Sequence, residues 1–121
     1  MNELFKLSIK EKLEGLENST FSSSELTKSY FERIKKIDPK INSYITVLEE
    51  LALSEAKKSD LRYSKNLNLP LDGIPIAHKD IFCTEGIKTT CGSKMLANFV
   101  SPYSSTVSSK FEKSGSIVLG K

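Results

Sequence analysis

Lys79 is the residue whose sequence surroundings best suit acid–base chemistry. Apolar residues flank it on both sides, namely Ile74, Ile76, Ala77, Ile81 and Phe82. Because apolar surroundings favour the neutral amine, a lysine buried there could accept a proton from a nucleophile. Residue chemistry alone favours a simpler interpretation, in which Lys79 ends a strand and pairs with Asp80 in solvent, since buried lysines are rare.

His78 and Cys83 offer a competing chemistry, because a thiol beside an imidazole can act as a nucleophile. Side chains alternate between the two faces of a strand, so His78 and Lys79 should point to opposite sides. If Lys79 faces a reactive site, the His78 side chain packs inside the protein or contacts a partner. We therefore expect a structural role for His78.

Cys83 and Cys91 are the only cysteines, and His78 is the only histidine. No C-x-x-C or H-x-x-x-H spacing is present, so the pattern does not indicate a zinc site. A disulfide is not expected in a reducing cytoplasm. We expect free thiols and no metal.

Beyond Lys79 lies a small, hydroxyl-rich loop that contains Thr89, Thr90, Gly92 and Ser93. Backbone N–H groups of such a loop can shape the floor of an active site. The same residue types also simply make loops. The sequence leaves both interpretations open.

The composition is that of an ordinary soluble chain of 121 residues, 38% hydrophobic and 27% charged. The net charge of +3 is small and spread along the chain, which does not indicate nucleic-acid binding. No apolar run approaches the roughly 20 residues needed to cross a bilayer. The N-terminus lacks the pattern of a secretion signal or a transit peptide. We expect a cytoplasmic protein.

The first half of the chain predicts three helices and one strand. Apolar residues recur at helical spacing from Ile9 to Leu16, and Gly15 is expected to stop that helix. A capping box, Ser22–Glu25, begins a second helix, which Asp38–Pro39 should end because the residue before a proline avoids helical geometry. The β-branched and aromatic run Ser43–Val47 predicts a short strand.

A third helix is predicted from Glu49 to about Tyr63. Ala52 and Ala56 form a stripe of small residues on it, which would let the helix lie close to a neighbour. The apolar periodicity is lost from Lys57 to Pro70, and we expect a surface connection there.

The second half predicts a strand, a helix and a strand. The buried strand Ile74–Ala77 contains Pro75, which argues against a central position in a ladder. Thr106–Lys113 is expected to be helical with Gly115 at its end, and Ile117–Leu119 is a compact apolar strand. This order is that of a βαβ-like unit in an α/β fold.

Several linked segments resemble the amidase-signature family, and most closely the A subunits of tRNA-dependent amidotransferases within it. The strand that carries the family's catalytic lysine is similar to Gly73–Asp80, and the loop after it resembles Cys83–Leu96. The run that leads into the family's signature resembles Asn98–Tyr103 and Gly115–Lys121. A weaker match runs from Ser24 to Thr46.

The chain departs from the family pattern in two places. Ser104 stands where the family usually has an acidic residue after Tyr103, which bears on a helix cap. The glycine- and serine-rich signature segment has no counterpart before the sequence ends at Lys121. Since a parallel strand normally feeds a further loop and helix, we expect this end to be a truncation point.

The resemblance implies an α/β fold in which helices pack on a mixed sheet. Residues 1–121 would form the N-terminal part of one amidase-signature domain, with a helical region at 1–65 and the start of the α/β core at 66–121. Lys79 would be the catalytic lysine of a Ser–cisSer–Lys triad, whose two serines and most glutamine-binding residues lie beyond Lys121. No metal or cofactor site is implied in this chain.

The resemblance also implies a function for the complete protein. It would hydrolyse glutamine and release ammonia to a B subunit, which uses ATP and Mg²⁺ to convert misacylated Glu-tRNA(Gln) to Gln-tRNA(Gln), while a C subunit holds the other two together. The tRNA would be bound through the complex, and this chain alone would be inactive. Two alternatives stay open, a fragment of a stand-alone amidase and a non-catalytic fragment.

Overall fold

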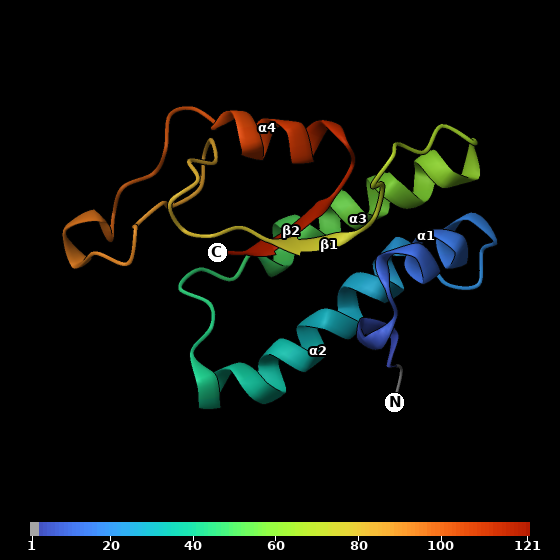
Figure 1. The fold of residues 1–121 in the computed structure, drawn as a ribbon, viewed down its shortest axis with the longest axis horizontal. Coiled ribbons are helices and arrows are strands. Elements are labelled where there is room, and N and C mark those ends of the chain that lie inside the picture. Colours follow the sequence, from blue (N-terminus) through green and yellow to red (C-terminus); the bar gives the residue numbers. More distant parts are fainter. Residues whose placement is uncertain (1–2) are drawn as a thin grey trace.

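The computed structural model describes residues 3–121 and has the predicted α/β architecture. Its elements in chain order are η1 (Leu4–Lys6), α1 (Ile9–Glu17), α2 (Ser23–Ile41), α3 (Glu49–Ser64), β1 (Pro75–Ala77), η2 (Lys94–Leu96), α4 (Thr106–Lys113) and β2 (Ile117–Gly120). Helices α2 and α3 pack on each other and on the strands. In Figure 1, α4 lies on the opposite side of the strands from α2.

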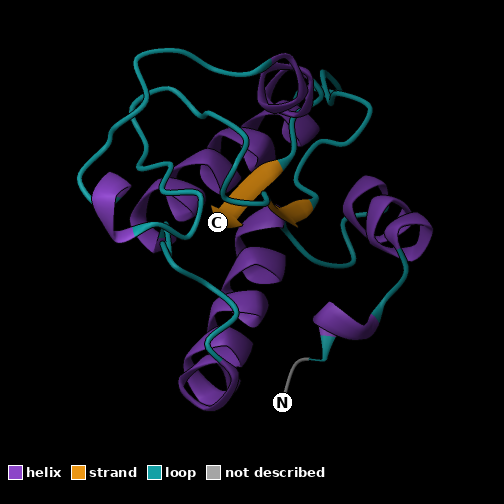
Figure 2. Cartoon of the chain, turned by 60° about the vertical axis from the view of Figure 1, so that its left-hand side comes forward, coloured by secondary structure: helices purple, strands orange, loops and turns teal. Residues whose placement is uncertain are grey.

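The predicted βαβ-like unit is confirmed. β1 and β2 pair in parallel, with Pro75 opposite Ile117 and Ile76 opposite Val118, and α4 lies in the connection between them. Figure 2 shows the two strands side by side among the helices. In parallel strands the carboxyl ends lie at the same edge, so the residues that follow β1 meet those at the end of β2.

Two clusters of buried apolar side chains hold these layers together. The first joins Phe31 and Ala52 of the helices to Ile117 and Leu119 of β2. The second joins Leu16, Leu26 and Ile74. The core therefore links the N-terminal helices to the strand at the end of the chain.

The first predicted helix stop is wrong, because α1 continues through Gly15 to Glu17. Gly15 is buried against Phe21, and a Cβ atom at this position would overlap Cε1 of that ring. The glycine therefore permits close packing rather than ending the helix.

The capping box at the start of α2 is confirmed, with the Ser22 hydroxyl accepting from the Glu25 N–H and the Glu25 carboxylate accepting from the Ser22 N–H. The predicted end at Asp38–Pro39 is wrong, since α2 continues to Ile41. Pro39 lacks an N–H group and so removes one hydrogen bond near the end of α2, but it does not interrupt the helix. The Asn42 N–H still donates to the Asp38 carbonyl over 2.7 Å, and Asn42 ends the helix in a left-handed conformation.

The predicted strand Ser43–Val47 is also wrong, because this segment forms only one isolated antiparallel bridge, Val47 to Gly120. The N–H groups of Ile45 and Thr46 both donate to the Lys121 carbonyl, and the Lys121 N–H donates to the Thr46 carbonyl. The segment thus meets only the end of β2 before α3 begins at Glu49, which leaves no room for a ladder.

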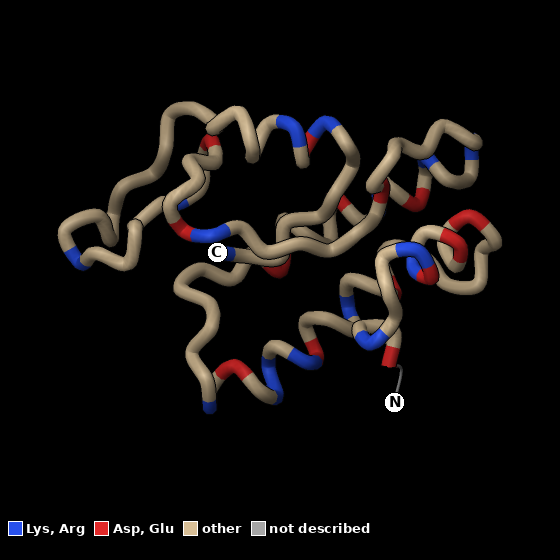
Figure 3. The backbone as a smooth tube through the Cα atoms, viewed as in Figure 1, with Lys and Arg blue, Asp and Glu red and all other residues tan. Residues whose placement is uncertain are grey.

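The third helix is confirmed as α3, with Ala52 and Ala56 buried in its packed face. The surface connection starts later than the predicted Lys57, because residues 57–64 are still helical. Figure 3 shows basic and acidic residues interspersed along the backbone. Within the described residues 3–121, no helix combines the length and apolar character required to span a membrane.

Candidate active site

Lys79 lies just beyond β1, with its side chain exposed between two buried neighbours, His78 and Asp80. The predicted alternation of His78 and Lys79 is confirmed. The Lys79 carbonyl accepts from the Phe82 N–H over 3.1 Å, which closes a turn. Within residues 3–121 the Lys79 ammonium has no hydrogen bond or ion pair, so it is available to other groups.

The simpler interpretation of the sequence, in which Asp80 pairs with Lys79 in solvent, is wrong. The Asp80 carboxylate points into the molecule, where Oδ2 accepts from both the N–H and the hydroxyl of Thr90. The Asp80 carbonyl accepts from the Cys91 N–H over 2.8 Å. The structure therefore separates the two neighbours, with the carboxylate buried and the amine exposed.

Lys121 supplies the cation for this buried carboxylate. Its side chain is 0% exposed, and Nζ lies 3.6 Å from Asp80 Oδ1. The ammonium also donates to the Phe82 carbonyl over 2.8 Å and to the Thr89 hydroxyl over 2.6 Å. A buried charge needs such partners, because an unpaired charge in the interior is costly.

Sequence reasoning missed Lys121 as a residue of this site. A signal was present, because Lys121 follows one apolar strand and Asp80 follows another. The predicted strands are parallel neighbours, so their carboxyl ends share an edge. That placement brings the two opposite charges together.

The hydroxyl-rich loop forms hydrogen bonds to this charge pair through its side chains. Thr89 and Thr90 are buried and contact Lys121 and Asp80, respectively. The N–H groups of the loop are all used within the fold: those of Thr89, Cys91 and Ser93 donate to backbone carbonyls, that of Thr90 donates to Asp80 Oδ2, and that of Gly92 donates to the Thr90 hydroxyl. The sequence leaves two interpretations of these residues open: a loop whose N–H groups shape the floor of an active site, or a simple loop. Because these N–H groups bond within the fold, the pattern favours the simple loop.

His78 is a packed residue, as expected. Its N–H donates to the Gly120 carbonyl over 3.1 Å, and its ring meets Phe111 edge-on at a centroid distance of 5.7 Å. Burial, followed by the positive charge of Lys121, lowers the pKa of His78. Its Nε2 atom has no hydrogen-bond partner among the described residues.

No nucleophilic Cys–His pair is assembled within residues 3–121. Cys83 is half-buried and its Sγ atom lies 3.7 Å from the Tyr103 hydroxyl, while Cys91 is exposed. Both thiols are free. The same part of the chain contains no group of three His, Cys, Asp or Glu side chains placed to hold a metal.

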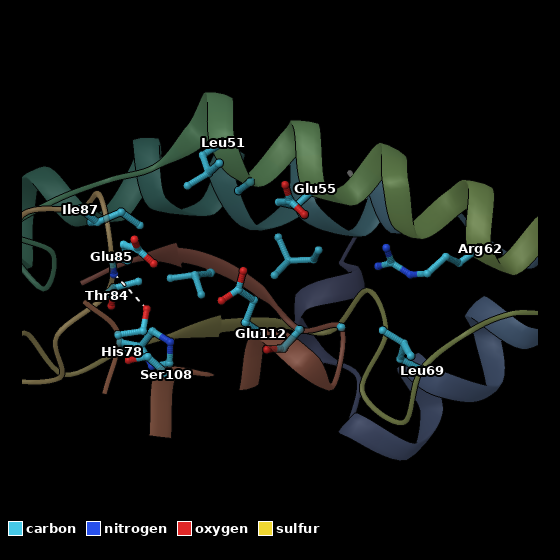
Figure 4. A pocket seen from close by; sticks show the side chains of 16 residues that line it. Leu51, Glu55, Arg62, Leu69, His78, Thr84, Glu85, Ile87, Ser108 and Glu112 are labelled. Atoms are coloured by element: carbon cyan, nitrogen blue, oxygen red, sulfur yellow. Dashed lines mark hydrogen bonds between the residues drawn. The ribbon is translucent and has the colours of Figure 1, made fainter. Parts of the chain in front are cut away.

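A cavity of about 360 Å³ lies beside the strands, on the side of His78 rather than Lys79. Figure 4 shows His78 and Ser108 at one wall, with Leu51 and Glu55 of α3 across from them. Lys79 does not line it. The cavity is therefore not part of the Lys79 site.

Comparison with known proteins defines the family. The family model described as Amidase matches residues 25–121. The chain is 54% identical over 121 residues to the A subunit of glutamyl-tRNA(Gln) amidotransferase from Acinetobacter baumannii (strain ATCC 17978), covering all of this chain and 25% of the relative. It is 51% identical over 113 residues to the protein of the same name from Hahella chejuensis, covering 93% of this chain and 23% of the relative.

Solved structures agree with this assignment. The peptide amidase of Stenotrophomonas maltophilia superposes with a TM-score of 0.89 at 26% identity, covering 96% of this chain and 24% of that chain. The present chain spans about a quarter of the length of the curated relatives it matches. By sequence and by fold, the chain belongs to the amidase family.

Proposed function

We propose that this chain is the N-terminal part of the glutamine-hydrolysing subunit of a tRNA-dependent amidotransferase, with Lys79 as its catalytic lysine. The identity of 54% to an amidotransferase A subunit over the whole chain supports this assignment. The observation that carries the role of Lys79 is its placement. It follows the end of β1, and its amine is free while both sequence neighbours are fixed in the interior.

This placement suits a proton carrier whose partners come from the rest of the protein. A neutral amine at Lys79 takes a proton that a bridging serine relays from the nucleophilic serine. The serine oxygen then attacks the carboxamide carbon of glutamine, the C–N bond breaks, and ammonia leaves with a proton returned through the same groups. Water hydrolyses the resulting acyl ester, releases glutamate and restores the serine.

The partners follow from this assignment. Ammonia passes to a B subunit, which uses ATP and Mg²⁺ to amidate Glu-tRNA(Gln), and a C subunit joins the other two. The tRNA is bound through the complex, and the protein works in the cytoplasm as part of translation. Residues 1–121 hold no cofactor in this proposal.

The test uses a full-length chimera in which residues 1–121 replace the matching quarter of the Acinetobacter baumannii A subunit, produced together with the B and C subunits of that organism. Lys79→Ala should remove glutamine hydrolysis, because a catalytic unit that lacks one member loses nearly all of its rate. Lys94→Ala is the matched control, since Lys94 is also exposed. Its rate should equal that of the unchanged chimera.

Circular dichroism and thermal melting establish that both variants fold. A folded Lys79→Ala chimera that keeps a tenth or more of the rate would refute the role of Lys79.

A further inference from the structure

We propose that Lys121 is a positioning residue that occupies Asp80 and thereby keeps the Lys79 amine free to carry a proton. The inference rests on the proposed function, in which Lys79 is the catalytic lysine. Lys121 itself touches no reacting group in this scheme. It acts through the carboxylate next to Lys79 in the sequence.

Asp80 is a potential competitor for the Lys79 amine. A lysine held beside a carboxylate stays protonated, and a protonated amine cannot accept a proton. Asp80 is joined to Lys79 by one peptide bond, and the flexible four-carbon stem of lysine can turn back toward such a neighbour. An unoccupied Asp80 would therefore compete with the reaction for the Lys79 amine.

Lys121 removes that competition by pairing with Asp80. Its ammonium lies 3.6 Å from Asp80 Oδ1, while Thr90 satisfies Oδ2. Oδ1 has no hydrogen-bond partner within the described part of the chain, so the charge of Lys121 is its main compensation. Both side chains are buried, where water screens the pair little.

Lys121 is held in place by hydrogen bonds from both its side chain and its backbone. Its Nζ donates to the Phe82 carbonyl and the Thr89 hydroxyl, and its backbone exchanges hydrogen bonds with Ile45 and Thr46. The Phe82 N–H in turn donates to the Lys79 carbonyl. The same ammonium thus fixes both the carboxylate and the turn that carries Lys79.

The test compares three versions of the full-length chimera: Lys121→Met, which leaves Asp80 uncompensated, Asp80→Asn/Lys121→Met, which removes both charges, and Lys94→Met as an exposed control. Lys121→Met should lower kcat for glutamine about tenfold to a hundredfold, in the range that misplaced catalytic groups cost. Its KM should stay within about twofold, because both side chains of the pair are buried in the interior rather than open to a substrate. The double variant should regain at least about tenfold in kcat, since no carboxylate is left to capture Lys79.

A merely structural role gives different results. In that case kcat and KM worsen together, and the double variant is no better than Lys121→Met. Either result overturns the proposal. If Lys121→Met does not fold, the double variant decides alone: a folded double variant within about tenfold of the unchanged kcat supports the proposal, and a larger loss overturns it.

A crystal structure of the Lys121→Met chimera gives a readout that needs no activity. Lys79 Nζ should then lie within hydrogen-bonding distance of an Asp80 carboxylate oxygen, and an amine still turned away would overturn the proposal. An inactive unchanged chimera, or an active Lys79→Ala chimera, would refute the proposed function instead. The crystal structure would still test the ion pair in that case.

Discussion

Arg62 Nε and Asp72 Oδ2 lie 2.6 Å apart, in an ion pair that ties the last turn of α3 to the turn before β1. A second contact, Arg62 Nη2 to Asp72 Oδ1 at 2.7 Å, makes the pair bidentate. The Leu69 N–H donates to the same carboxylate, which is 0% exposed. Burial acts to raise the pKa of Asp72, but the hydrogen bonds and charge of Arg62 outweigh it, and the net shift is downward.

Arg62→Met should destabilise the full-length chimera by about 3 kcal/mol at pH 7, because it leaves a buried carboxylate without its cation. A lowered pKa in the folded state means that this contribution is present above the unfolded value of about 3.9 and is lost as the pH falls below it. The difference between the unchanged and variant chimeras should therefore shrink between about pH 5 and pH 3, measured by urea unfolding. A gap that stays constant over this range would contradict the assignment.

Gly115→Ala should destabilise the chimera more than Gly86→Ala. Both glycines have positive φ, +87° and +75°, so each substitution carries a conformational cost of about 1 kcal/mol. At Gly115 the new Cβ would also lie 2.8 Å from the Asp72 Cα, whereas at Gly86 nothing lies within 4 Å. Thermal melting of the two variants checks this, and equal losses would show that the contact at Gly115 has no cost.

His78 should make the chimera less stable as the pH falls below neutrality. Its pKa is lowered in the folded state, so the unfolded chain binds more protons and is favoured as the pH drops through about 6.5. The loss is at most about 1.4 kcal/mol per pH unit. His78→Gln should flatten the profile of unfolding free energy between about pH 5 and pH 7, and an unchanged profile would refute this.

The 121-residue chain purified alone should neither hydrolyse glutamine nor behave as a well-packed monomer. Within residues 3–121 no nucleophile is paired with Lys79, and the exposed apolar side chains include Leu61, Leu67 and Met95 at 61%, 64% and 95%. Exposed apolar surface and open strand edges recruit other chains. Analytical ultracentrifugation with thermal melting tests this, and a monomer with a sharp, concentration-independent transition would show a self-sufficient domain.

The sequence predicts those elements whose signals are local. The capping box at Ser22–Glu25, the small-residue stripe on α3 and the order of β1, α4 and β2 all depend on residues close together in the chain, and all are confirmed. The errors have a different origin. Gly15 lies inside α1 and packs against Phe21, and a glycine in a helical pattern does not by itself distinguish a packing position from a helix end.

The candidate site likewise contains one feature that the sequence predicts and one that it does not. Alternation along a strand is enough to separate His78 from Lys79. The burial of Lys121 is not predictable in this way, because it depends on two strand ends that meet only after α4 has crossed between them. The nearest amine in the sequence suggests the wrong partner for Asp80, since proximity along the chain does not decide which charges share the interior.

The core cluster that joins Phe31 and Ala52 to Ile117 and Leu119 sets an order of events during synthesis on the ribosome. Helices α2 and α3 leave the exit tunnel long before β2 exists, so they emerge with the apolar faces that β2 will cover still exposed. β1 likewise waits for the strand with which it pairs. A nascent chain halted before Ile117 can form its helices but cannot close this core, and the interval before β2 emerges is when chaperones have most reason to engage it.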